Sequence, residues 1–404
     1  MKQRWRIDRI LLAVLLLVLA ILLFYYWPIG PRWEVANEEP LGFDLTKGLL
    51  YTVNSKPIPS GDTFRLFGYD LASGQRLVNL PLELSNQDAS DHPNWSALLS
   101  ADSKKLVCWT DSGQGIVVFD IAQDARRLFG FKPGNIFVDS IGFSADGKLL
   151  AFRNAYEVHV WDCTTGKLQQ TLKMPNGTIT GYRSGIWVTH LDQMQFSHDN
   201  QYLAVGGEIN EVVVFHIASG RVIGQCVGSK VSLFETDGKT LINLPAVFQS
   251  GHLQRFEIQG GALITSPSPE SPEIEQDRLL TANLHSILTF QPILETPKPL
   301  PEWIPRVVRD YLTSLRGRPK IIFNIKSSDT HTGQLQQEFA LRAANISNPL
   351  LSSDGSYLAI MDYAQLCLWD IPPRRSLTCW LVCIGMAALA FWLAWPRRMK
   401  QSSG

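Results

Sequence analysis

The chain has 404 residues, with 37 basic and 37 acidic side chains and therefore no formal net charge. A neutral chain offers no basic surface to the phosphate backbone, so we expect no nucleic-acid partner. Six cysteines in a chain of this length do not suggest the disulfide framework of a small secreted domain. We expect Cys108, Cys163, Cys226 and Cys367 to be buried free thiols, and Cys379 and Cys383 to lie on one face of a C-terminal helix.

The N-terminus is predicted to anchor the chain in a membrane. Residues 1–9 form a basic tail, and residues 10–27 are almost continuously apolar and end in Tyr-Tyr-Trp. At 1.5 Å per residue, about 18 residues span roughly 27 Å, close to the thickness of the bilayer core. A cleaved signal peptide is the alternative, but no small-x-small cleavage site follows the run. We therefore predict an uncleaved transmembrane helix.

A short phrase recurs in the middle of the chain. The clearest copies are Ser144–Phe152, Ser197–Val205 and Ser352–Ile360, and weaker ones are Ser100–Cys108 and Glu235–Asn243. Asp-Gly or Asp-Asn in the phrase predicts a two-residue hairpin turn, because Gly and Asn tolerate positive φ. The apolar residues that follow predict a buried strand. Repetition at intervals of roughly 40–50 residues is typical of an all-β architecture with one blade per repeat.

Each phrase is followed by a second, β-branched strand, and these strands give the number of blades. They lie at Phe64–Asp70, Ile116–Ile121, Val158–Cys163, Val212–Ile217, Leu253–Ile258, Ile321–Lys326 and Leu366–Ile371. The count predicts a β-propeller of seven blades over residues 32–373, with six or eight left open. The last blade lacks an outer strand, which Arg32–Ala36 could supply from the N-terminal side, closing the ring and removing exposed sheet edges.

Residues 260–320 are predicted as an insert in the propeller. They are longer than one blade requires and are rich in proline. Within them, Pro305–Arg316 has the apolar stripe and the end residues of a helix. It is either a lid packed on the propeller or a docking helix for a partner or the membrane surface. Arg306, Arg309 and Arg316 face away from the apolar stripe and are our candidates for partner binding.

The C-terminus repeats the pattern of the N-terminus. Residues 377–395 are apolar and long enough to span a bilayer, and residues 396–404 form a second basic tail. A buried helix of the propeller is one alternative, and a processed sorting tail is another, although Pro372-Pro373 stands where such a tail carries Pro-Glu-Pro. The Lys and Arg counts predict two spans with both termini in the cytoplasm, so that the propeller is extracytoplasmic.

The repeats resemble a known family. Ser144–Lys167, which contains V-H-V-W-D, is similar to a WD40 repeat, and Ser352–Asp370 also closes on Trp-Asp. The resemblance covers most of Leu41–Pro372 and implies a β-propeller that acts through protein interactions. The chain departs from the family in two respects. No Gly-His dipeptide precedes a blade, and Ala155 stands where the turn aspartate is usual, so we do not expect the family's buried hydrogen-bond network.

The sequence contains little that points to catalysis. Gly-x-Ser-x-Gly, His-Glu-x-x-His, a Walker loop and Cys-x-x-Cys are all missing from it. His159 and His216 fall on strands and are expected to be structural, and His190 and Asp192 have no third partner for a metal. We therefore predict no catalytic residue, no metal ligand and no cofactor.

Two functions of different classes remain. The first is a membrane-tethered scaffold that presents loops to an unknown protein partner. The second is a propeller enzyme, either a metal-dependent hydrolase or a quinoprotein-like dehydrogenase, since Asp70–Leu77 faintly resembles the turn of quinoprotein repeats. The aromatic residue of the repeats alternates between Phe and Trp, which suits packing rather than cofactor docking. We favour the interaction module, although a propeller can host either function.

Overall fold

The structure is a computed structural model of the whole chain. The chain forms two compact units: a β unit, Arg32–Trp369, and a helical unit made of both chain ends, Met1–Pro31 and Asp370–Gly404. The residues that the structure describes are 11–18, 20–21, 31–54, 64–84, 95–110, 115–131, 138, 140–154, 157–175, 194–206, 211–227, 232–235, 237–243, 251–252, 254–265, 273–274, 278–280, 286–293, 321–329, 335–343, 347–362, 364–371 and 377–394.

The described part of the β unit contains seven antiparallel sheets of four strands and one two-stranded pair. In hydrogen-bonded order, the first three sheets are β2 (Glu38–Asp44), β3 (Leu49–Asn54), β4 (Arg65–Asp70) and β5 (Arg76–Pro81); β6 (Trp95–Leu99), β7 (Lys105–Thr110), β8 (Ile116–Asp120) and β9 (Arg126–Phe131); and β10 (Ser140–Phe143), β11 (Leu149–Arg153), β12 (Glu157–Asp162) and β13 (Lys167–Lys173).

The other sheets follow the same order along the chain. They are β14 (Met194–Phe196), β15 (Tyr202–Gly206), β16 (Glu211–His216) and β17 (Arg221–Val227); β18 (Ser232–Phe234), β19 (Thr240–Asn243), β21 (Gln254–Gln259) and β22 (Ala262–Thr265); β24 (Arg278–Leu280), β25 (Ser286–Ile293), β26 (Ile321–Asp329) and β27 (Leu335–Ala343); and β28 (Ser347–Leu351), β29 (Tyr357–Asp362), β30 (Gln365–Asp370) and β1 (Trp33–Ala36). The two-stranded pair is β20 (Gly251–His252) with β23 (Glu273–Ile274), and a short 3₁₀ turn, η1 (Ile121–Gln123), precedes β9.

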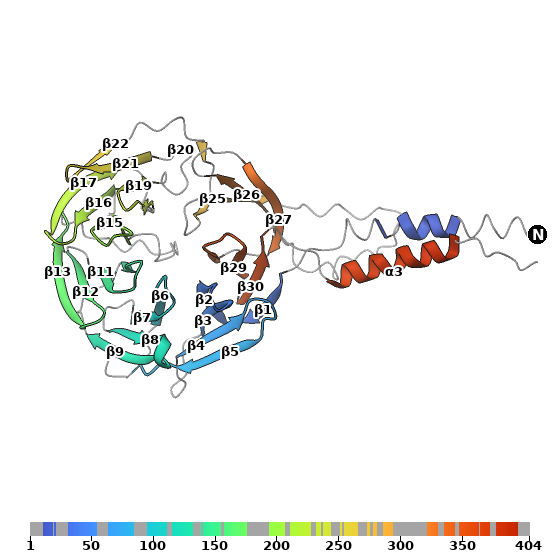
Figure 1. Cartoon of the computed structure of the whole chain (residues 1–404), viewed down its shortest axis with the longest axis horizontal. Coiled ribbons are helices and arrows are strands. Elements are labelled where there is room, and N and C mark those ends of the chain that lie inside the picture. The colour runs from blue at the N-terminus through green and yellow to red at the C-terminus, as the bar shows by residue number, and fades with distance from the viewer. Residues whose placement is uncertain are drawn as a thin grey trace, which may run out of the picture. The chain divides into compact units, whose positions relative to one another are not determined.

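The sheets follow one another around a ring (Figure 1). The prediction that the N-terminal segment completes the last sheet is confirmed, because β1 pairs antiparallel with β30 and places Trp33 opposite Leu368. One apolar cluster joins this last sheet to the first, through Leu366 and Leu368 on one side and Leu50 on the other. The first and last strands of the β unit therefore close the ring, and the prediction of an all-β fold is confirmed for this unit.

Burial shows how the sheets stack. Most second and third strands are buried on both faces, so that Leu106 and Val107, consecutive in β7, both have an exposed fraction of 0%; the third strands β12 and β21 are less buried. The fourth strands alternate between exposed and covered residues, as in β5 and β13. A strand is buried on both faces only when another sheet lies against each face. The central strands are therefore sandwiched between neighbouring sheets, and the fourth strands lie at the rim, which fits a β-propeller.

The strands that the sequence predicts as second in each sheet are third in the structure, because each sheet begins with a strand that was not predicted. The seven predicted second strands are the third strands of their sheets, β4, β8, β12, β16, β21, β26 and β30. A short strand such as β10 precedes the recurring phrase, and Ser144 follows its last residue. The connection is also longer than the predicted two-residue turn: Ser144 N bonds to Leu149 O, and the Gly147 amide bonds to Ser144 O. Only Gly147 in this turn has a positive φ, of 64°.

The two edges of the sheets differ in their connections. First and second strands, and third and fourth strands, are joined by two to five residues at one edge. We call this edge the short-turn face and the opposite edge the long-connection face. The latter carries the connections made by residues 55–64, 82–94, 174–193 and 294–320. The recurring phrases therefore all place their turns on the short-turn face.

Part of the predicted insert, residues 260–320, belongs to the repeating sheets. Strands β22, β24 and β25 lie within it, and β24 and β25 precede β26 in the sixth sheet. These strands lack the recurring phrase, so the pattern that identified the other sheets could not reveal them. The predicted helix Pro305–Arg316 lies outside the described residues.

The helical unit contains two described helical segments. Residues 11–18 and 20–21 are helical, and α3 covers Leu377–Ala394. The two segments touch where the Cys383 thiol approaches Ala20 O at 3.4 Å. Within the described part of the chain, no helix has the length and apolarity needed to cross a membrane. The two predicted spans are thus not confirmed, and residues 10, 19, 22–27 and 395 of those spans lie outside the described residues.

Candidate functional site

The residues predicted to bind a partner cannot be placed. Arg306, Arg309 and Arg316 lie in the connection between β25 and β26, outside the described residues, and so do His190 and Asp192. The described strands that this connection joins are β25 and β26, the second and third strands of their sheet, and the ends that it links lie at the edge of the long-connection face. The structure therefore gives no geometry for these side chains, and the functional surfaces that can be described lie elsewhere.

The best-defined polar feature is the repeated turn on the short-turn face. Ser144 Oγ donates to Asp146 Oδ1 at 2.8 Å and accepts the Leu149 amide at 2.9 Å. The same pair of bonds occurs at Ser100 with Asp102, Ser197 with Asp199 and Ser352 with Asp354. All four serines are buried. A buried hydroxyl that both donates and accepts holds the two strand ends at a fixed separation.

The fifth copy of the phrase also forms a hydrogen-bonded turn, but with other residues. Glu235 replaces the serine, and Asp237 instead accepts the Thr240 hydroxyl at 2.6 Å and two backbone amides at 2.8 Å. In the first sheet, Asp44 accepts the Thr46 hydroxyl at 2.6 Å and pairs with Lys47 Nζ at 3.1 Å. A carboxylate that satisfies backbone amides is therefore the constant element of these turns.

Hydrogen bonding keeps the carboxylates of Asp146, Asp237 and Asp354 ionised. Partial burial alone would raise the pKa of Asp146, but donors from the Lys148 amide, Ser144 and Asn200 lower that pKa to about 2. The pKa values of Asp237 and Asp354 are also lowered, again because hydrogen bonds outweigh burial. A general acid at neutral pH requires a raised pKa. These aspartates are suited to stabilising turns rather than to transferring protons.

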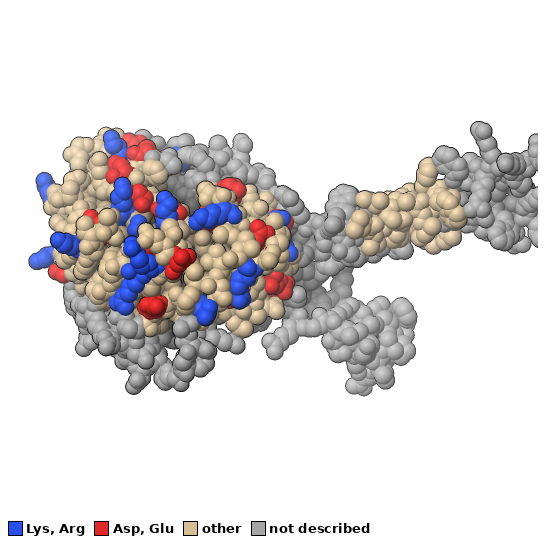
Figure 2. Space-filling view, turned by 60° about the horizontal axis from the view of Figure 1, so that its bottom comes forward, with Lys and Arg blue, Asp and Glu red and all other residues tan. Residues whose placement is uncertain are grey.

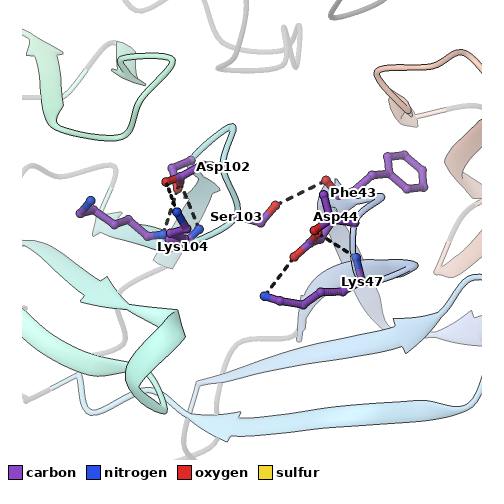
Figure 3. A network of polar contacts seen from close by, with 9 residues as sticks. Phe43, Asp44, Lys47, Asp102, Ser103 and Lys104 are labelled. Carbon is purple, nitrogen blue, oxygen red and sulfur yellow. Dashed lines mark hydrogen bonds and ion pairs between the residues drawn. The ribbon is translucent and has the colours of Figure 1, made fainter.

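The turns of neighbouring sheets also touch one another. In four of the five copies of the phrase, the residue after the aspartate has a positive φ and lies against the turn of the preceding sheet; Gly355 in the last copy has the positive φ but no such contact. Ser103 Oγ donates to Phe43 O at 3.4 Å (Figure 3). Asn200 bonds to Asp146, and a Cβ on Gly238 would lie 3.3 Å from Asp199 Oδ1. These contacts between turns were not predicted from the sequence. The residue after the aspartate, which is Ser, Gly, Asn and Gly in four successive copies of the phrase, could have indicated them.

The charged side chains of the surface are mixed in sign. Figure 2 shows basic and acidic residues interspersed over the visible face, with no large area of one sign. Lys104 and Lys148, in two of the repeated turns, are 65% and 70% exposed and pair with the aspartate of their own turn. Such exposed pairs contribute little stability and leave the lysines free to meet water or other polar groups.

A buried polar network lies in the first sheet. The Glu38 carboxylate is 4% exposed and accepts bonds from the Thr52 hydroxyl, from Tyr69 Oη at 2.7 Å and from Arg76 Nη2 at 2.9 Å. Burial and the bond to Glu38 raise the pKa of Tyr69 to about 12. The Arg76 guanidinium also stacks on the Phe67 ring at 4.3 Å. Both carboxylate oxygens are satisfied, so the network links strands rather than forming a reactive site.

His159 on β12 and His216 on β16 both bond to neighbouring side chains. His159 Nε2 lies 3.1 Å from Asn154 Nδ2, and its ring stacks on Phe152 at 5.0 Å. Burial lowers the pKa of His159, despite the opposing effect of Glu157, so the ring is neutral at pH 7. His216 Nδ1 bonds to Ser219 Oγ at 2.8 Å in an exposed turn. His159 Nδ1 likewise lies 3.3 Å from the Thr171 hydroxyl, so each ring bonds to a neighbouring side chain of its own sheet.

The tryptophans of the Trp-Asp pairs pack without their indole nitrogens being used. Trp161 stacks on Phe131, from the neighbouring sheet, with ring centroids 4.1 Å apart. Among the described residues, neither Trp161 Nε1 nor Trp369 Nε1 has a hydrogen-bond partner. Aromatic stacking between sheets, rather than a hydrogen bond from the indole, holds Trp161 in place.

The four cysteines of the β unit are buried thiols, as predicted, whereas Cys383 in the helical unit is partly exposed. Cys108, Cys163, Cys226 and Cys367 are free and at most 4% exposed. Burial raises the pKa of Cys108 and raises those of Cys163 and Cys226 to about 12, so these thiols stay protonated and unreactive. The described residues also contain no group of three or more His, Cys, Asp or Glu side chains that could hold a metal ion.

The helical unit buries small side chains and exposes large apolar ones. Its most buried residues are small, namely Ala13, Ala20 and Ala390 at 5–6% exposure. Its large apolar side chains point outward, and twelve of them are at least 46% exposed: Leu11, Leu12, Val14, Leu15, Leu17, Val18, Ile21, Leu381, Ile384, Leu389, Phe391 and Trp392. Helix pairs in water bury their large apolar side chains between them, whereas the described part of this unit exposes them.

Comparison with known proteins gives no relative: the chain matches no protein-family model, and no curated protein matches it.

Proposed function

We propose that the protein is a membrane-tethered, WD40-like β-propeller of seven blades that acts as a protein-interaction scaffold. One observation carries the proposal: a closed ring of four-stranded sheets is attached, through both chain ends, to one apolar helical unit. The ring supplies a rigid platform, and the helical unit supplies an anchor.

The anchor is supported by the distribution of side chains in the helical unit. Helices that expose large apolar residues and meet through alanines are typical of pairs surrounded by lipid, where close packing rather than burial from water drives association. Neither helical segment contains a charged residue over residues 11–21 and 377–394. In this proposal, the basic tails, residues 1–9 and 396–404, lie in the cytoplasm and the propeller lies outside it.

The proposed scaffold role is supported by the difference between the two faces of the β unit. The short-turn face is tied together by turns of at most five residues and by contacts between neighbouring turns. The long-connection face carries the longest segments of the chain, among them residues 174–193 and 294–320. Long connections on a rigid frame are where binding residues concentrate in proteins. Partner binding is therefore assigned to the long-connection face, with Arg306, Arg309 and Arg316 as candidates.

The membrane tether is tested by extracting native membranes with alkaline carbonate. The full chain is expected to remain in the membrane pellet, and its release into the supernatant would contradict the tether. Topology is tested with cysteines introduced at Ser266 and Ser402. An impermeant thiol reagent should label the first on intact cells, with any outer membrane permeabilised, and should spare the second. The reverse pattern would overturn the assignment of cytoplasmic termini.

The partner is sought by proximity labelling from a tagged C-terminus in native membranes. A variant with Arg306, Arg309 and Arg316 replaced by Ala should be present in the membrane at the wild-type level but label the partner less. Equal labelling would exclude these arginines from the interface. The enzyme alternative is tested separately, by elemental analysis and an absorption spectrum of the purified protein. About one tightly bound metal ion per chain, or a quinone spectrum, would favour the hydrolase or the dehydrogenase.

A further inference from the structure

We infer that the short-turn face of the β unit faces the lipid headgroups, so that the long-connection face points away from the membrane. The inference rests on the proposed membrane tether. It follows from where the chain enters and leaves the ring, and from the lengths of chain between the ring and the predicted spans.

Both ends of the β unit lie on the short-turn face. Strand β30 runs from Gln365 to Asp370 and ends at the edge where the turn of Ser352 and Asp354 lies. Strand β1 begins at the same edge, because Trp33 is opposite Leu368 while Ala36 is opposite Gln365.

Side-chain contacts fix the entry of β1 at this edge. Trp33 Nε1 donates to Leu71 O at 3.2 Å, and Arg32 Nε donates to Ala72 O at 3.2 Å. Residues 71–75 form the turn between β4 and β5, which is one of the short turns. The chain therefore enters and leaves the ring through one face, at neighbouring points.

The two linkers favour one orientation of the ring, because turning it over would require both of them to be stretched along its full thickness. Residues 28–31 separate Arg32 from the first predicted span, and residues 371–376 separate Asp370 from α3. At about 3.6 Å per residue these linkers reach at most roughly 18 Å and 25 Å. A strand of five or six residues is itself about 17–20 Å long. With both linkers leaving from the short-turn face, that face lies nearest the bilayer, and the opposite face lies about one strand length farther away.

The chemistry of the short-turn face suits this position. Its carboxylates are satisfied within their own turns, and exposed lysines of several turns extend outward from them. A polar face with charges of both signs and few unsatisfied groups can lie against a hydrated headgroup layer without burying an unpaired charge. The long segments on the other face then remain accessible to a partner outside the membrane.

The test measures which face lies closer to lipid in the full chain. Two variants, Lys148→Cys on the short-turn face and Lys173→Cys at the opposite edge of the same sheet, are made with Cys379 and Cys383 replaced by Ala. The cysteines that remain in the β unit are buried, so a thiol-reactive fluorophore marks one position in each variant. The labelled proteins are reconstituted into phosphatidylcholine vesicles that carry an energy acceptor on the headgroup.

Flotation of the vesicles is measured first and energy transfer second. We expect both variants to float with the vesicles, and transfer to be several-fold higher from position 148 than from position 173. Failure to float would refute the membrane tether and this inference with it. Flotation with equal transfer, or with higher transfer from position 173, would overturn the orientation alone and leave the tether intact.

Discussion

Asp102 and Gly147 come from neighbouring sheets and touch on the short-turn face. A Cβ atom on Gly147 would lie 3.1 Å from Asp102 Oδ1, which is closer than ordinary van der Waals contact. Gly147 also has a φ of 64°, a conformation that disfavours residues with a side chain. One glycine therefore meets two requirements, that of its own turn and that of the contact with the neighbouring sheet.

Replacing Gly147 with Ala should destabilise the β unit by more than the backbone cost alone. The left-handed conformation costs about 1–2 kcal/mol for a residue with a Cβ, and the close approach to Asp102 adds to it. Urea unfolding of the fragment Arg32–Pro373 measures the total.

Gly355→Ala is the matched control for this substitution. Gly355 occupies the same place in its turn, with a φ of 72°, but nothing lies within 4 Å of its Cβ position. The control should show the backbone cost only. If the two variants were equally stable, the contact between sheets would contribute nothing.

Asp146 should make the stability of the β unit depend on acid. Its pKa in the folded state is lowered to about 2 from an ordinary value of 3.8. The ionised form is thus favoured by folding, and this stabilisation is present above about pH 4 and is lost as the pH falls toward 2. Asp146→Asn should therefore be less stable than the wild type at pH 7, and the difference should shrink toward pH 2. A difference that stayed constant with pH would disprove the ionised turn.

Closure of the ring should depend on β1. Deleting Trp33–Ala36 from the fragment Arg32–Pro373 removes the ladder to β30, the bond from Trp33 Nε1 to Leu71 O and the stacking of Trp33 on Tyr69 at 5.6 Å. A domain of this size loses roughly 2 °C of Tm for each kcal/mol. We expect Tm to fall by several degrees, with aggregation through the open edge. An unchanged Tm would mean that this segment is only a linker.

The repeating phrase carried most of what the sequence could reveal of the fold. Each copy combines a turn with two apolar strands, and five of the seven sheets contain one. The third strands of the other two sheets, β4 and β26, were predicted from their own apolar and β-branched residues. The first strands are as short as three residues, as in β14, and have no pattern of their own. Strands β24 and β25 were missed because their sheet lacks the phrase.

Contacts between residues far apart in the chain could not be predicted from the sequence. The buried Arg153 donates from Nη1 to Gly206 O in the next sheet, although the two residues are 53 positions apart. Glu38 and Arg76 likewise meet only because β2 and β5 belong to one sheet. Such pairs depend on the order and register of the strands, which local patterns do not encode.

The buried thiols offer a direct test of the packed β unit. The fragment Arg32–Pro373 contains Cys108, Cys163, Cys226 and Cys367, all buried. Because the thiolate is the reactive form and burial disfavours it, a thiol reagent at pH 7.5 should modify none of them in the folded fragment. All four should react in denaturant. Rapid modification of any one before unfolding would show that its strand is exposed.

The packing of the helical unit can be tested with a cysteine at Ala20. Ala20 is 5% exposed, and the Cys383 thiol lies 3.4 Å from its carbonyl oxygen. In the full chain with Cys379 replaced by Ala, the Ala20→Cys variant should form a disulfide with Cys383 under mild oxidation, seen by mass spectrometry of the linked peptides. The matched control is Leu15→Cys, because Leu15 lies on the same segment but is 62% exposed. Since residue 15 points outward, it should not cross-link to Cys383. Equal cross-linking at both positions would mean that the two segments do not hold a fixed face toward each other, and the pairing of the chain ends through small residues would then be wrong.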